Sequence, residues 1–216
     1  MIGIIKDKTD NRRGPRWAQI VSDVFSPLLM PTYGMAMAMW ITPLRAVPES
    51  NRLIATLIVA AVTALVPLGV IMLLLKLGKV SDFAISNLRE RLVPYSVAVV
   101  CYCAAGWIMR LIGAPSWLTM FFVGAAFSTA AALVITLVWK ISAHATAAGG
   151  LVGMMLWFTV SGLADVHAMI WLSAVIVLAG VISTSRMLLG RHTLSQVLAG
   201  LALGFAGCYG AMWIHF

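Results

Sequence analysis

The sequence predicts an all-α protein built as a polytopic bundle of transmembrane helices. Its residues are 62% hydrophobic and only 10% charged, and the mean hydropathy is +0.98. Soluble domains usually carry about 25% charged residues. The apolar residues gather in long uncharged runs, of which residues 53–75 are the clearest, and such runs are long enough to cross a bilayer. The charged residues lie mainly in short links between these runs.

Six segments are predicted to be firm membrane spans. They are residues 53–75, 95–112, 117–139, 145–162, 168–184 and 193–214. Residues 1–21 form a polar, basic tail, and residues 22–216 form a single transmembrane domain because no linker divides them. A seventh apolar segment, residues 22–41, contains Pro27, Pro31 and Gly34. These residues interrupt helices, so this segment is predicted to span, to kink, or only to dip into the bilayer.

Three polar links are predicted to emerge on one face of the membrane. Two spans separate the link 76–94 from the link 140–144, and two more separate that link from residues 185–192. Together the three links hold seven of the 15 Lys and Arg residues and two of the four histidines. Charged residues at a membrane face are costly and are often functional, so this face is the predicted location of a site. Asp165 and His167 belong to the opposite face and are assigned to a turn.

Composition also limits the partners and cofactors. The net charge of +8 comes from residues in the links, which is how membrane topology is set, and no basic stripe with interleaved aromatic residues indicates a nucleic-acid partner. The expected partners are the lipid bilayer and a substrate within it. Cys101, Cys103 and Cys208 lie in apolar segments and show neither disulfide nor zinc spacing. The seven acidic residues are scattered, so no metal site and no cofactor are predicted.

Two short motifs in these links carry a family resemblance. The stronger is Ser185-Arg186, followed by His192 and then Gln196, and the weaker is Ile141-Ser142-Ala143-His144. A faint third motif consists of Arg91 and Pro94. In order and spacing, residues 76–204 resemble the membrane branch of the type 2 phosphatidic acid phosphatase superfamily. The resemblance implies hydrolysis of a membrane lipid phosphate or diphosphate without a metal ion.

The resemblance also implies roles for individual residues. His192 corresponds to a nucleophile that forms a phosphohistidine, and His144 to the general acid and base. The expected phosphate-binding residues are Arg186, Ser142, Arg91, Ser185 and Lys79. Arginine suits this role because its planar guanidinium group donates two parallel hydrogen bonds to phosphate oxygens.

The chain departs from the family pattern at two positions. Ala84 stands where the family lysine precedes the motif arginine, and Lys79 lies five residues too early. Gln196 replaces the family aspartate four residues after His192. Its amide can accept a hydrogen bond from the histidine or present its NH₂ group instead. Two alternatives to hydrolysis therefore stay open: a lipid phosphotransferase that uses the same site, and a non-catalytic protein that binds or transports phospholipids.

The orientation in the membrane depends on residues 22–41. The family implies a multi-pass protein of the cytoplasmic membrane whose site usually faces outward. If residues 22–41 span, the tail joins the motif face, which then holds 12 of the 15 basic residues and is predicted to be cytoplasmic. If they form a re-entrant segment, the tail lies on the opposite face. The two prolines favour this second arrangement and, with it, an outward-facing site.

Overall fold

The computed structural model describes residues 14–80 and 92–214, which contain helices and no strand. The α-helices are α1 (Arg16–Val24), α2 (Met30–Ile41), α3 (Glu49–Ala60), α4 (Val66–Lys76), α5 (Leu92–Leu111), α6 (Ser116–Thr136), α7 (Ala143–Val160), α8 (Ala168–Leu188) and α9 (Leu194–Trp213). A 3₁₀ turn, η1 (Pro43–Ala46), precedes α3, and a π-helical turn, η2 (Ala61–Leu65), joins α3 to α4. The predicted all-α bundle is confirmed.

Six helical segments are long and apolar enough to cross a membrane. They are Glu49–Lys76, Leu92–Leu111, Ser116–Thr136, Ala143–Val160, Ala168–Leu188 and Leu194–Trp213. These segments correspond to the six predicted spans. Their outer faces expose large apolar side chains such as Leu57, Val100 and Phe127, which suits contact with lipid.

Proline accounts for the irregular turn within the first long segment. Pro67 has no backbone N–H and its ring clashes with the carbonyl of residue 63, so a regular α-helix cannot continue through this position. The wider π-helical turn of η2 ends at Leu65, two residues before the proline, and relieves the clash. Glu49–Lys76 therefore remains one membrane-crossing unit.

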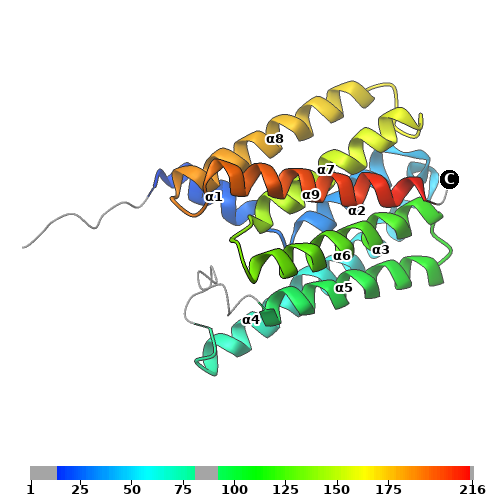
Figure 1. Ribbon diagram of the computed structural model, residues 1–216. Coiled ribbons are helices and arrows are strands. Elements are labelled where there is room, and N and C mark those ends of the chain that lie inside the picture. The colour runs from blue at the N-terminus through cyan, green and yellow to red at the C-terminus, as the bar shows by residue number, and fades with distance from the viewer. Residues whose placement is uncertain (1–13, 81–91, 215–216) are drawn as a thin grey trace, which may run out of the picture.

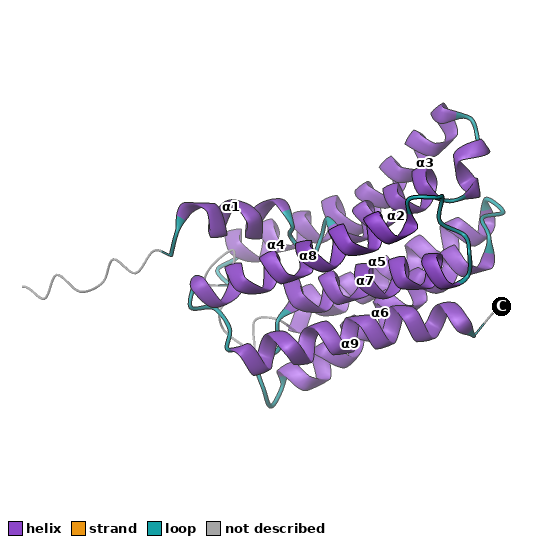
Figure 2. Cartoon of the chain, turned by 90° about the horizontal axis from the view of Figure 1, so that it is seen from above, coloured by secondary structure: helices purple, strands orange, loops and turns teal. Residues whose placement is uncertain are grey.

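The links that carry the motifs lie at one end of the bundle, which we call the motif end. In Figure 1 the α6–α7 link and the α8–α9 link are at the same end as α1, and the C terminus is at the other end. The end of α4 and the start of α5 also lie there. Figure 2, from a perpendicular direction, again places α1 away from the C terminus. The shared face expected for these links is thus present in the fold.

Residues 22–41 cross from the motif end to the opposite end. Ser22 contacts His144 and Arg186 at the motif end, whereas the carbonyl of Ile41 accepts a hydrogen bond from the N–H of Asp165, 3.0 Å away, at the other. The crossing is not one regular helix, because a turn at residues 25–29 separates α1 from the 12 residues of α2. The re-entrant arrangement that the sequence favoured is therefore wrong. Residues 16–21, expected in the polar tail, are part of α1.

Helices α7 and α9 pack backbone against backbone. A Cβ atom added to Gly204 would overlap the carbonyl oxygen of Thr146, and one added to Gly149 would overlap that of Leu201. A Cβ atom added to Gly153 or to Gly200 would likewise lie only 2.7 or 2.8 Å from a carbonyl oxygen. Small residues of this kind let membrane helices approach closely. Since α7 and α9 both begin at the motif end, this contact fixes the spacing of the two motifs that precede them.

Candidate active site

His192 is oriented by the first turn of α9. The residue is buried, with 8% of its surface exposed, and its Nδ1 atom lies 3.1 Å from Oε1 of Gln196. The same Oε1 atom accepts a hydrogen bond from the backbone N–H of Thr193 at 3.2 Å. The Thr193 hydroxyl in turn accepts from the N–H of Gln196. The result is a reciprocal capping box at the start of the helix.

This capping box determines which end of the Gln196 amide faces the histidine. A backbone N–H can only donate, so the group bonded to Thr193 must be the amide oxygen rather than the NH₂. An oxygen acceptor beside Nδ1 then requires Nδ1 to carry a proton. In the neutral ring, Nε2 is left with the lone pair, which is the form that a nucleophile needs. A glutamine therefore supplies the orienting contact that an aspartate would supply, although without its charge.

Arg186 and His144 meet at one residue of the N-terminal helix. Arg186 lies near the end of α8 and is buried, with 8% of its surface exposed. Its Nη1 atom donates to the hydroxyl of Ser22 at 2.5 Å. His144, in the first turn of α7, places Nε2 at 3.0 Å from the Ser22 carbonyl and 3.2 Å from its hydroxyl. A buried cation and an imidazole thus lie side by side.

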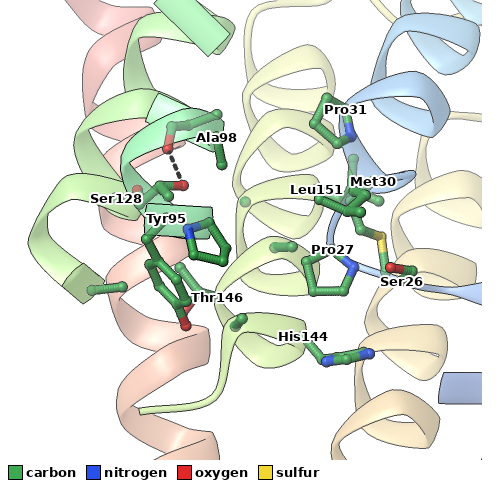
Figure 3. Close-up of a pocket in the computed structure, with 18 of the residues that line it drawn as sticks. Ser26, Pro27, Met30, Pro31, Tyr95, Ala98, Ser128, His144, Thr146 and Leu151 are labelled. Atoms are coloured by element: carbon green, nitrogen blue, oxygen red, sulfur yellow. Dashed lines mark hydrogen bonds between the residues drawn. The ribbon is translucent and has the colours of Figure 1, made fainter. Parts of the chain in front are cut away.

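These groups line one end of a cavity of about 470 Å³. The motif residues on its wall are His144, Arg186 and His192, joined by Arg191 from the same link. The remainder is mostly apolar and is formed by α1 and the turn after it, and by α2, α4, α5, α6, α7 and α9. In Figure 3, His144 points toward the N-terminal segment with Ser26 and Pro27, and Ala98 lies across the cavity from Pro31. The cavity is therefore cationic and imidazole-rich at one end and apolar beyond it.

Several predicted phosphate-binding residues are not on this wall. Ser142 is fully buried and caps α7 by accepting from the N–H of Ala145. The Ser185 hydroxyl donates to the carbonyl of Val181 in its own helix. Lys79 is exposed just after α4 and does not line the cavity. The two serine hydroxyls therefore form hydrogen bonds with the backbone of α7 and α8, and Lys79 lies outside the cavity. Arg91 lies outside the described residues.

Sequence reasoning missed the contribution of the N-terminal segment. Gln19, Ser22, Asp23 and Ser26 all line the cavity, and Ser22 touches two motif side chains. No motif marks these residues: Gln19 falls in the predicted tail, and the other three fall in the segment 22–41, whose path the sequence left open. A weak signal was available in the amphipathic spacing of Ala18 and Ser22, which form the buried face of α1.

Residues 138–216 match the family model of the PAP2 superfamily. This match is consistent with the resemblance to that superfamily over the C-terminal part of the chain. It contains His144, Arg186, His192 and Gln196, and it does not extend to the link 76–94, where the resemblance was faint. Comparison with curated proteins and with solved structures gave no significant match.

The match to the PAP2 superfamily model supports phosphatase-type activity on phosphate esters. The site described above has the chemical groups for it: a buried guanidinium group that can donate to phosphate oxygens, an imidazole whose Nδ1 is bonded to Gln196, and a second imidazole nearby. Within the described ranges, no three His, Cys, Asp or Glu side chains converge as a metal site would require.

Proposed function

We propose that this protein hydrolyses a membrane lipid phosphate or diphosphate through a phosphohistidine on His192. The observation that carries the proposal is the division of the cavity into two parts. Arginine and imidazole side chains line the motif end, and mostly apolar side chains line the rest. A ligand with a charged head and an apolar tail satisfies both parts, whereas a small soluble phosphate ester leaves the apolar part filled only by water.

In the first step, Nε2 of His192 attacks phosphorus and the bond between phosphorus and the ester oxygen breaks. His144 gives its proton to the departing alkoxide, which leaves as an alcohol. Arg186 donates hydrogen bonds to the phosphoryl oxygens as charge shifts among them. The Nδ1–H of His192 stays bonded to Gln196 Oε1, so the phosphorylated ring keeps its orientation.

In the second step, a water molecule attacks the phosphohistidine. His144, now neutral, accepts a proton from that water, and the bond between phosphorus and Nε2 breaks. Inorganic phosphate leaves and both histidines return to their starting protonation states. An alcohol in place of the water would make the same reaction a phosphotransfer.

We also place the site on the cytoplasmic face of a cytoplasmic membrane. Residues 22–41 cross the bundle, so the N-terminal helix shares the motif end. Among the described residues, the basic side chains at the motif end are Arg16, Lys76, Lys79, Lys140, Arg186 and Arg191, and those at the other end are Arg45, Arg52 and Arg110. An excess of Lys and Arg usually marks the cytoplasmic side.

The experiment is phosphate release by the purified protein in detergent micelles, measured on substrates that share a head and differ in their tails. Phosphate monoesters of a long-chain alcohol and of glycerol form the central pair, and a long-chain diphosphate is a third substrate. We expect release from the long-chain esters and little from glycerol phosphate. Added short alcohols reveal phosphotransfer as new phosphate esters. Absence of release from every substrate, with the protein folded, would contradict the proposal.

A further inference from the structure

Ser22 links two residues of the proposed machinery that no motif connects. It lies in the last turn of α1, 122 residues before His144 and 164 residues before Arg186. Its side chain is buried, with 3% of the residue exposed. The hydroxyl accepts from Arg186 Nη1 at 2.5 Å and lies 3.2 Å from His144 Nε2, while the carbonyl lies 3.0 Å from the same nitrogen.

The carbonyl contact decides the protonation of His144. A carbonyl oxygen can only accept a hydrogen bond, so Nε2 of His144 must carry a proton that it shares between the two oxygens of Ser22. In the neutral ring Nδ1 then holds the lone pair and is the atom that takes up and delivers the exchangeable proton. A histidine that serves as acid or base needs a partner on its other nitrogen to fix the tautomer and ring plane.

From these contacts we infer that Ser22 is a positioning residue, which holds His144 in its reactive tautomer and sets its distance from Arg186. The role parallels that of Gln196 beside His192, but the partner comes from the opposite end of the chain. Because one hydroxyl bonds both side chains, movement of Ser22 displaces the acid and the phosphate-binding cation together. This inference rests on the proposed function of His144 and Arg186.

The surrounding structure keeps Ser22 in place. Ala18 and Ser22 are the buried positions of α1, one turn apart, and α1 packs along α8. The turn that follows is held by two tyrosine hydroxyls: Tyr33 donates to the carbonyl of Val24 at 2.8 Å, and Tyr102 donates to that of Pro27 at 3.4 Å. The serine is therefore fixed by its helix and by contacts on the turn beyond it.

A double-mutant cycle tests the inference. The variants are Ser22→Ala, His144→Ala and the pair, assayed on a long-chain alkyl phosphate and on an aryl phosphate, whose better leaving group keeps the rate measurable without an acid. Ser22→Ala keeps the carbonyl contact and removes the hydroxyl that His144 and Arg186 share. We expect it to lower kcat about tenfold on the alkyl ester, a part of the roughly 10²- to 10⁴-fold that a positioned acid contributes. On the aryl ester, the same change should cost less in the His144→Ala background than in the parent, and the loss that remains measures the effect of Ser22 on Arg186.

Two controls separate positioning from folding. Ser183→Ala removes the hydroxyl of another buried serine, on the helix against which α1 packs, whose Oγ bonds nothing among the described residues. It should leave kcat unchanged. Ser22→Thr keeps the hydroxyl and should restore most of the activity that Ser22→Ala loses. Thermal unfolding of each variant gives the fraction of the protein that is folded, and each rate is divided by that fraction.

The outcomes are distinct. If Ser22→Ala lowers kcat by the same factor with and without His144, the role of Ser22 is structural. If Ser22→Ala raises kcat, Ser22 competes with phosphate. Either result overturns the inference. Absence of activity in the unmodified protein would instead overturn the proposed function.

Discussion

The Oε1 atom of Gln196 accepts two hydrogen bonds at once, from Nδ1 of His192 at 3.1 Å and from the backbone N–H of Thr193 at 3.2 Å. Because the N–H of Thr193 can only donate, the second bond fixes the orientation of the Gln196 amide. The first bond then requires the proton of the neutral His192 ring to be on Nδ1. Gln196→Glu, which keeps the reach and the acceptor, should retain or raise kcat. Gln196→Leu removes the acceptor and should lower kcat by roughly 10³- to 10⁴-fold, as loss of the correct tautomer does in a serine-protease triad.

A matched change to the capping box separates this effect from loss of a helix cap. Thr193→Ala removes the other half of the box and leaves the histidine contact, so it should cost about 1 kcal/mol of stability while the rate per folded molecule is kept. Steady-state rates and thermal unfolding of the three variants give the comparison. A Leu variant with the parental rate would show that another group orients His192.

Replacement of His192 should abolish turnover and leave the fold intact, because the residue lies in a link before α9 rather than inside a helix contact. The direct measurement is acid-labile, alkali-stable labelling of the protein by a ³²P-labelled long-chain phosphate in a rapid-quench experiment. The parent should be labelled and His192→Ala should not. His167→Ala, at the opposite end of the bundle, serves as the control and should label normally.

His144→Ala should slow the reaction in proportion to the basicity of the leaving group. An alkoxide needs a proton as it departs and an aryl oxide needs it less, so the loss should approach about 10²- to 10⁴-fold for alkyl esters and be much smaller for aryl esters. Rates over a series of esters with different leaving-group pKa values give the slope. The same loss for every ester would indicate that His144 binds substrate rather than protonating the product.

Gly204→Ala should destabilise the bundle. The added methyl group meets the carbonyl of Thr146 on α7, and backbone cannot move aside as a flexible side chain can. We expect a cost of about 1–3 kcal/mol, seen as a lower unfolding temperature in detergent. Gly180→Ala is the control, since a methyl group there has no atom within 4 Å. Equal unfolding temperatures for both variants would contradict the close packing of α7 and α9.

The orientation can be read from cysteine labelling in a background that lacks Cys101, Cys103 and Cys208. Ser195→Cys reports the motif end and Val166→Cys, at an exposed position of the α7–α8 turn, reports the other. A membrane-impermeant thiol reagent applied to intact cells should label position 166 and reach position 195 only after lysis. The reverse pattern would place the site on the outer face.

The helices and their shared end could be predicted from the sequence because hydropathy and charge act locally. A long uncharged run must span, and an even number of spans returns the chain to the same face. The path of residues 22–41 could not, because its two prolines favour a re-entrant segment in the sequence but also fit a broken crossing. The contacts that decide it, from Ser22 to His144 and from Asp165 to Ile41, join segments more than 100 residues apart.

Three of the predicted site residues, His144, Arg186 and His192, lie on the cavity wall, and their catalytic and phosphate-binding roles stay predictions. Motif spacing did not identify which motif residues form hydrogen bonds with the backbone instead of facing the cavity. Ser142 and Ser185 both lie next to wall residues, but their hydroxyls bond within α7 and α8. Whether a serine caps a helix or faces a ligand depends on backbone angles that spacing alone does not specify. Their direct phosphate contact therefore stays a prediction without support from the geometry.

The glycine-lined contact between α7 and α9 also bears on substrate selectivity. Two helices whose backbones touch have no side chains between them that could change rotamer, so they move as one rigid body, and the two histidines at their starts keep a constant separation. The opposite wall is formed by the turn after α1, tied by single tyrosine hydrogen bonds. Accommodation of a thicker or branched tail must therefore come from that turn, and variation in Pro27 or Met30 would alter which tails are accepted without altering the chemistry.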